Sequence, residues 1–256
     1  FGYFMTRVGH EHSEPLFRFW DSVFAVMMKI TELVMKFAPI GVFGLIGAVI
    51  AKLDFSEVGE LLSVLATYAA VVAVALLVHL LVVLPAFLRF AGGVRPYATL
   101  TAMAPALLTA FSTSSSSATL PVTMDCVEER AGVSPKIASF VLPLGATVNM
   151  NGTALYECVS AMFLAQAYGL ELTLTTQLVI VVTALVTSIG VAGVPSASLI
   201  AIAIILQTIG LPLEAIGVLF VFDRVLDMAR TAVNIFGDAC CAVIIARREG
   251  EQTLLA

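Results

Sequence analysis

The sequence predicts an all-α polytopic membrane protein, and two observations lead to that prediction. Of the 256 residues, 60% are hydrophobic and 12% are charged, whereas a soluble domain is about 25% charged. The chain also has four long uncharged runs, and each reaches the roughly 20 residues that a helix needs to cross a bilayer. These runs are Leu61–Leu88, Pro96–Met124, Ile137–Tyr156 and Leu172–Leu213. The net charge of −5 and the lack of a basic patch argue against a nucleic-acid partner.

The first part of the chain predicts two membrane-spanning helices. Residues 21–52 have a long helical pattern, and the sequence APIG at 38–41 predicts a bend because Pro39 lacks a backbone donor. Residues 61–88 form an uncharged span. The Gly- and Pro-containing sequence AGGVRP at 91–96 ends this span at a membrane boundary.

Two later segments are interrupted and do not fit a simple span. Residues 97–130 are broken by STSSSSATLP, and residues 172–213 by TSIGVAGVPSAS. Each break is followed by a helix with polar residues at its middle, GATVNMNGT at 145–153 and DMARTAVNIFGD at 227–238. The two units follow each other at a nearly constant interval, which predicts an internal repeat. Because backbone at membrane depth must be buried or line a cavity, we expect the two breaks to meet at one binding site.

The last helix carries polar residues at spacings of three and four, which places them on one helical face. They are Asp223, Asp227, Arg230, Thr231, Asn234 and Asp238. Ionisable groups within a membrane are costly, so such a face is a functional candidate. The alternative is a structural ion pair between Asp227 and Arg230, which would leave Asn234 and Asp238 unexplained.

Four motifs together resemble the glutamate transporter family of dicarboxylate/amino acid:cation symporters. They are SSSSATLPVT, LPLGATVNMNGTALYE, SIGVAGVP and DMARTAVNIFGD, in this order along the chain. The resemblance implies transmembrane helices plus two re-entrant helical hairpins in an inverted-repeat glutamate transporter fold. It also implies that the chain begins inside a longer protein, after the family's first helices.

The resemblance further implies a division of the chain. Residues 1–20 would end a preceding scaffold segment, and residues 21–96 would contain the family's fifth and sixth helices. Residues 97–256 would form the transport core. Within that core we expect hairpin 1 at 97–131, helix 7 at 134–170, hairpin 2 at 174–211, helix 8 at 212–247 and a short tail.

The resemblance assigns the substrate contacts to both hairpin tips and to helices 7 and 8. Serines of the first tip and Asn234 would hold the α-carboxylate of an amino acid, Asp227 its ammonium group, and Arg230 a side-chain carboxylate, for which a planar guanidinium is suited. Thr153 and Thr231 would orient the ligand, and the second tip would close over it. The residues implied at the two tips are Ser115, Ser116, Ser117, Val194 and Ser198.

The resemblance also implies two sodium sites built from oxygen atoms, which suit a hard cation. One would use side chains of Asp238, Asn149 and Asn234, with carbonyl groups of Gly145 and Asn234. The other would use only backbone carbonyl groups. Those carbonyls would come from Thr147, Ser188, Ile189 and Val191.

Some positions depart from the family pattern. Asn151 stands where an acid resembling a third sodium ligand is usual, and Ser198 where glycine is usual. Members of the family usually carry an additional arginine at one of two positions. In this chain the two positions are Ser114 and Met228, so the arginine is absent. We therefore hypothesise that the loss of one acid and one base keeps the charge balance of the site, with Arg224 contributing.

The sequence thus predicts a secondary active transporter for L-aspartate or L-glutamate, driven by a sodium gradient through an elevator mechanism. We expect a homotrimer in the cell membrane, no enzymatic activity and no cofactor besides the coupling ion. Alternatives are coupling to protons, prompted by Asn151, and a C4-dicarboxylate symporter. An intramembrane serine protease would need a general base near the serines, for which His79 is the candidate within a span. A channel would conflict with two breaks that occlude the path from both sides.

Overall fold

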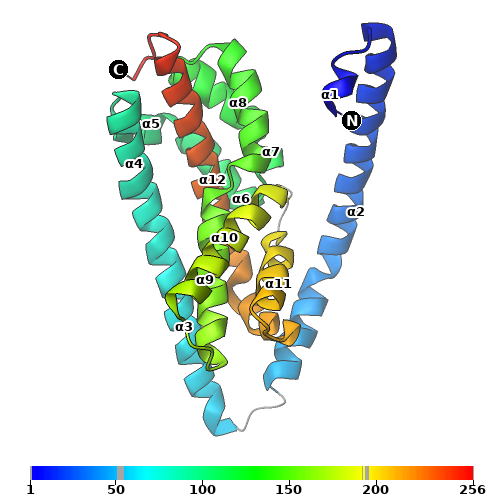
Figure 1. Ribbon diagram of the computed structural model, residues 1–256, viewed down its shortest axis with the longest axis vertical. Coiled ribbons are helices and arrows are strands. Elements are labelled where there is room, and N and C mark those ends of the chain that lie inside the picture. The colour runs from blue at the N-terminus through cyan, green and yellow to red at the C-terminus, as the bar shows by residue number, and fades with distance from the viewer. Residues whose placement is uncertain (1, 51–54, 192, 194–195, 256) are drawn as a thin grey trace. The chain divides into compact units, whose positions relative to one another are not determined.

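The computed structural model describes residues 2–50, 55–191, 193 and 196–255, and these residues form helices and connecting turns without strands (Figure 1). The expected all-α class is therefore confirmed. The chain divides between residues 52 and 53 into two units. The first unit contains α1 (Gly2–Met5) and α2 (His10–Ile50). The α2 helix continues through Pro39, where the sequence predicted a bend.

The second unit begins with a long continuous helical segment that contains two π-helical turns. It comprises α3 (Phe55–Val78), the π-helical turn η1 (His79–Val83), α4 (Leu84–Phe87) and a second π turn, η2 (Leu88–Gly92). Pro85 explains part of this irregularity, because proline has no N–H to give to the carbonyl group of Leu81. The hydroxyl group of Tyr97 donates to that carbonyl instead, at 3.1 Å.

Two pairs of short helices follow, and the two helices of each pair contact each other. In the first pair, α6 (Ala104–Thr113) and α7 (Ser116–Asp125) are separated by residues 114–115, which we call the first tip. In the second pair, α10 (Leu174–Gly190) and α11 (Ser198–Thr208) are separated by residues 191–197, the second tip. Ser114 and Ser196 both have positive φ, so each tip contains a residue in the left-handed region. The remaining short elements of this region are α5 (Pro96–Ala102) and the π turn η3 (Cys126–Arg130).

Each pair is followed by a helix that carries polar residues. The first is interrupted: α8 (Pro135–Val148) ends before Asn149 and Met150, whose ψ values of 59° and 60° are not helical, and α9 (Asn151–Ala167) starts directly after them. The second, α12 (Phe220–Arg248), is preceded by a 3₁₀ turn, η4 (Leu213–Leu219), and is continuous. Because α12 packs against α3, α6, α8 and α9, most of its residues are buried.

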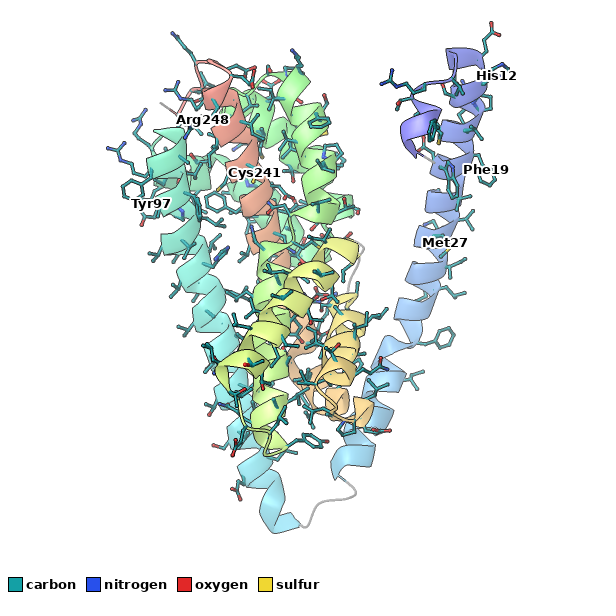
Figure 2. All side chains as sticks on the ribbon, viewed as in Figure 1. His12, Phe19, Met27, Tyr97, Cys241 and Arg248 are labelled. Atoms are coloured by element: carbon teal, nitrogen blue, oxygen red, sulfur yellow. The ribbon has the colours of Figure 1, made fainter. Side chains whose placement is uncertain are left out.

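Two helical stretches among the described residues are long and apolar enough to cross a membrane by length and composition, Gly59–Gly92 and Leu213–Arg248. The C-terminal ends of these two stretches lie at the same end of the unit, where Tyr97 and Arg248 are found (Figure 2). The tail that follows α12 fastens this end. Its backbone bonds to Arg95 and Ala131, and the Glu251 carboxylate accepts hydrogen bonds from the N–H and hydroxyl groups of Ser134 at the start of α8.

Substitution of Gly132 tests how much the contact between the tail and residue 132 contributes to stability. It has φ +75°, and a Cβ atom there would lie 2.7 Å from Leu254 Cγ and 2.9 Å from Leu254 N. Gly169 has φ +72° with no atom within 4 Å of such a Cβ, so it is a matched control. Both alanine variants should lose roughly 1–2 kcal/mol from the left-handed backbone, but Gly132→Ala should lose more because it displaces the tail. Thermal unfolding in detergent measures both, and equal shifts in Tm would contradict the tail contact.

Candidate functional site

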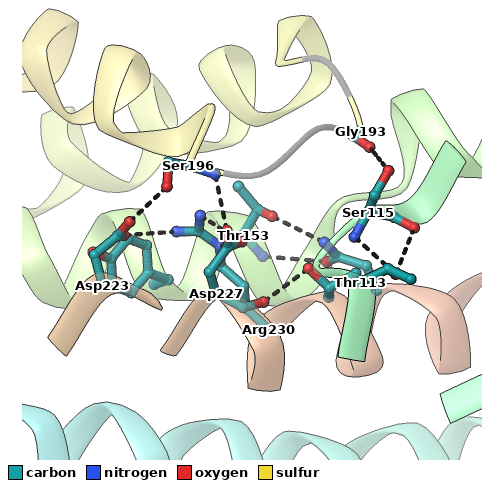
Figure 3. A network of polar contacts seen from close by, with 11 residues as sticks. Thr113, Ser115, Thr153, Gly193, Ser196, Asp223, Asp227 and Arg230 are labelled. Carbon is teal, nitrogen blue, oxygen red and sulfur yellow. Dashed lines mark hydrogen bonds and ion pairs between the residues drawn. The ribbon is translucent and has the colours of Figure 1, made fainter. Parts of the chain in front are cut away.

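The polar residues of α12 converge with both tips in one buried region (Figure 3). A small cavity of about 20 Å³ lies there, which is room for one or two water molecules. Its lining includes seven residues that the sequence assigned to the substrate. These are Ser116, Thr153, Ser198, Asp227, Arg230, Thr231 and Asn234. The cavity as described is far too small for an amino acid.

Arg230 is the centre of the region and is 2% exposed. Its Nε donates to Asp227 Oδ1 at 2.9 Å, and its Nη2 lies 2.7 Å from the same oxygen. Its Nη1 lies 3.7 Å from Asp223 Oδ1 and has no hydrogen-bond partner among the described residues. The guanidinium carbon also lies 4.5 Å from the centroid of the Tyr156 ring, a cation–π distance. One cation is thus shared by two carboxylates and lies over an aromatic ring.

Tyr156 supports this arrangement from α9. Its hydroxyl group donates to Asp223 Oδ1 at 2.9 Å, so one side chain orients the second carboxylate and stacks on the guanidinium. Behind it, the hydroxyl groups of Tyr68 and Ser160 are 2.7 Å apart, which ties α9 to α3. The sequence identified Asp223 through its helical spacing, but it assigned no role to Tyr156, which belongs to one of the four family motifs.

The second tip is bonded to the acids of α12. The Ser196 N–H donates to Asp227 Oδ2 at 2.8 Å, and the Ser196 hydroxyl donates to Asp223 Oδ2 at 3.0 Å (Figure 3). Ser196 was not among the residues predicted from the sequence. Its neighbour Val194, which was, lies outside the described residues. Ser196 therefore joins the second tip to both carboxylates.

The first tip contacts the second tip as well as the cavity. The Ser115 hydroxyl donates to the Gly193 carbonyl at 2.8 Å, and the Ser117 N–H donates to the same carbonyl at 3.4 Å. Ser115 also caps α7 by accepting from the Ala118 N–H. Of the three predicted serines, only Ser116 lines the cavity, together with Ser114, which sequence reasoning did not assign to the substrate. Ser115 and Ser117 instead join the two tips.

Asn234 links α12 to the helix interruption. Its Oδ1 accepts from the N–H groups of Gly152 and Thr153 at 2.8 and 3.2 Å, and its Nδ2 donates to Thr153 Oγ1 at 2.9 Å. The first N–H groups of a helix have no partner within it, so a side chain from α12 supplies the cap that α9 itself lacks. One amide thus fixes both the start of α9 and the position of Thr153.

The residues predicted for the first sodium site lie one turn further along α12. Asp238 is 1% exposed and accepts from Asn149 Nδ2 at 2.9 Å. A Cβ atom at Gly145 would lie 2.6 Å from Asp238 Oδ1, so the α8 backbone passes directly against this carboxylate. The Oδ1 of Asn151 is buried without a hydrogen-bond partner among the described residues. Asp238, Asn149 and Gly145 are thus neighbours, while Asn234 lies on the preceding turn.

The residues predicted for the second sodium site are more dispersed. Val191 lines the small cavity, and Ser188 is buried with its hydroxyl group donating to the Leu185 carbonyl. Thr147 and Ile189 are exposed. Among the described residues no cluster of three or more His, Cys, Asp or Glu side chains could hold a metal ion, so a cation here would depend largely on amide and carbonyl oxygens.

The helix α12 is long enough to cross a membrane and carries buried acids and one buried base. Two helix interruptions lie against these side chains. This combination is typical of transport proteins with discontinuous helices. The comparison with known families agrees, because the model of the sodium:dicarboxylate symporter family matches residues 1–248. The chain belongs to this family. The resemblance that the four motifs indicated is therefore confirmed.

Several curated relatives are similar over nearly the whole chain. Human excitatory amino acid transporter 1 is 40% identical over 235 residues, which is 92% of this chain and 43% of the relative. Mouse excitatory amino acid transporter 3 is 42% identical over 255 residues, 98% of this chain and 48% of the relative. A putative sodium-dependent excitatory amino acid transporter of Caenorhabditis elegans is 40% identical over 237 residues, 93% and 47% respectively. The chain thus spans less than half the length of these relatives.

The substitution Tyr156→Phe tests how much the hydrogen bond from Tyr156 to Asp223, beside Arg230, contributes to stability. The change keeps the ring but leaves a buried carboxylate oxygen of Asp223 without its donor, which should cost about 1–3 kcal/mol. Tyr68→Phe removes a hydrogen bond between two neutral groups behind the site and should cost about 0.5–1.5 kcal/mol. Unfolding in detergent compares the two variants. A smaller loss of stability for Tyr156→Phe than for Tyr68→Phe would show that the Asp223 contact contributes little.

Proposed function

We propose that the protein that carries this chain is a secondary transporter that takes up acidic amino acids together with sodium. The observation that carries this proposal is the buried pairing of Arg230 with Asp227 beneath both tips. Arginine suits a side-chain carboxylate, and Asp227 suits an ammonium group. A ligand with both charges, such as L-aspartate or L-glutamate, can replace the internal ion pair without leaving either charge unpaired.

The buried charges favour coupling to a cation. Four carboxyl groups are buried among the described residues, Glu157, Asp223, Asp227 and Asp238, and Arg230 is the only buried Lys or Arg side chain there. A buried carboxylate without a counter-charge is strongly unfavourable, so it takes up a cation or a proton. The sodium named in the family description fits this deficit of positive charge. Proton coupling, suggested by Asn151, is the alternative that the same deficit permits.

Substrate entry requires the second tip to open. The cavity of about 20 Å³ has to expand, and the two Ser196 hydrogen bonds have to break to free Asp227 for an ammonium group. Ser116 and Asn234 then hold the α-carboxylate, Arg230 the side-chain carboxylate, and Thr153 and Thr231 orient the ligand. For Asn234 this means that its amide group must release Thr153 Oγ1. The second tip, with Val194 and Ser198, is proposed to close over the bound ligand.

Sodium is proposed to bind where oxygens gather around Asp238, with Asn149, Asn151, Asn234 and the Gly145 carbonyl as the other ligands. Support comes from the neighbouring positions of Asp238, Asn149 and Gly145 and from the unpartnered Oδ1 of Asn151. A second sodium would use the carbonyl groups at 147, 188, 189 and 191, and it would bind only after these segments come closer together.

The architecture follows from the same proposal. The helix pairs α6–α7 and α10–α11 are proposed to be the re-entrant hairpins of an inverted repeat in the cell membrane. In this scheme residues 97–256 are the transport core, 21–96 two membrane helices and 1–20 the end of a scaffold segment. In this proposal the protein is a homotrimer, and the transport core of each protomer moves across the membrane as a rigid body, which is the elevator mechanism.

Uptake of labelled L-aspartate into liposomes that contain the full-length protein tests the proposed function. We expect uptake with an inward sodium gradient and none with a proton gradient at matched voltage. Asp238→Asn should reduce sodium-driven uptake by about tenfold or more, because it removes the anionic ligand of a hard cation. Asp125→Asn, an equal change of charge at an exposed position, should leave uptake unchanged. Uptake driven by protons alone would overturn sodium coupling.

A further inference from the structure

An open groove of about 540 Å³ lies between η1, α4, η2 and the end of α12, away from the site described above. Apolar side chains from residues 82–91 line it, and Arg248 is the charged residue among its lining residues. Its aromatic side chains are strongly exposed, 59% for Phe87 and 87% for Phe90. Large contiguous apolar surfaces of this kind mark contacts with lipid or with another protein.

The groove lies at the end of the unit that carries most of its positive charge. The tail bonds that join Arg95, Ala131 and Ser134 to residues 251–255 bring several chain segments together at this end. Six of the eight Lys and Arg residues between positions 53 and 256 belong to these segments. They are Arg89, Arg95, Arg130, Lys136, Arg247 and Arg248. Lys and Arg concentrate on the cytoplasmic side of membrane proteins, so the groove faces the leaflet that contains anionic lipids.

Tyr97 lies at the same end of the unit as the groove. Its side chain is 62% exposed, and its hydroxyl group bonds to the Leu81 carbonyl beside the first groove residues. Figure 2 shows Tyr97 and Arg248 at the same end of the unit. Residues 82–91 therefore run from the level of the Tyr97 hydroxyl group towards the charged end of the unit, where the guanidinium group of Arg248 lies.

We propose that this groove binds one anionic phospholipid. An acyl chain lies along residues 82–91, and the guanidinium group of Arg248 pairs with the headgroup phosphate. Charge complementarity favours this occupant. A neutral helix in the groove would leave Arg248 next to apolar surface without a counter-charge, and free phosphate has no use for the apolar lining. The proposal requires only a membrane location, so it does not depend on the substrate or on the coupling ion.

Photo-crosslinking in vesicles tests the proposal with the full-length protein. Phosphatidylglycerol and phosphatidylcholine, each with a photoreactive acyl chain, are incorporated separately, and the labelled residues are located by mass spectrometry. We expect phosphatidylglycerol to label residues 82–91 about fivefold more than phosphatidylcholine, the preference that one Lys or Arg gives near a charged surface. Arg248→Gln should remove this preference. Arg130→Gln, the same change at an exposed position of that end outside the groove, should keep it.

Three outcomes would overturn the proposal. Equal labelling by both lipids, or a preference that survives Arg248→Gln, would mean that the headgroup is not recognised. Loss of the label on addition of inorganic phosphate would assign Arg248 to a free anion. An absence of label in residues 82–91 from either lipid would mean that another part of the protein or a second copy covers the groove. Filling the groove with Ala86→Phe should lower labelling by both lipids, and unchanged labelling would place the acyl chain elsewhere.

Discussion

The Arg230 guanidinium group, buried between two carboxylates and an aromatic ring, is the interaction on which the rest of the site depends. A single cation shared by Asp223 and Asp227 leaves one negative charge in excess. Burial of an incompletely compensated pair is costly, and the structure offsets this cost with directed hydrogen bonds from Tyr156 and Ser196. The result is a site whose charges are oriented yet still able to accept a further positive charge.

The two tips are coupled through this centre and through each other. Ser196 bonds the second tip to the acids Asp223 and Asp227 of α12. The Gly193 carbonyl receives hydrogen bonds from Ser115 of the first tip and from Ser117 in the first turn of α7. In the proposed function, a ligand at Asp227 would compete with Ser196 for the same carboxylate. Opening of the second tip and release of the binding groups would then be one event, as a gated transport site needs.

Much of this arrangement could be predicted because it depends on local pattern. Helical periodicity placed Asp227, Arg230 and Asn234 on one face of α12, and the runs of small residues located both helix interruptions, whereas Pro121 lies inside α7. The pairings across the chain could not be predicted in the same way. That Ser115 donates to Gly193, that Ser196 bonds to Asp223, and that Asn234 caps α9 are consequences of tertiary contacts between residues far apart in sequence. Periodicity carries no information about which distant group a buried donor will meet. The left-handed backbone at Ser114 and Ser196 also lacked the usual glycine signal.

The most direct test asks whether substrate replaces the Arg230–Asp227 ion pair. Isothermal titration calorimetry would measure the affinities of three ligands for the full-length protein in the presence of sodium. L-aspartate carries both charges that the pair requires, succinate lacks the ammonium group, and L-alanine lacks the side-chain carboxylate. A site that reads each group by a buried polar partner should bind both analogues more than about 100-fold more weakly than L-aspartate. Succinate binding as tight as that of L-aspartate would show that Asp227 does not recognise an ammonium group, and equally tight binding of L-alanine would show the same for Arg230 and the carboxylate.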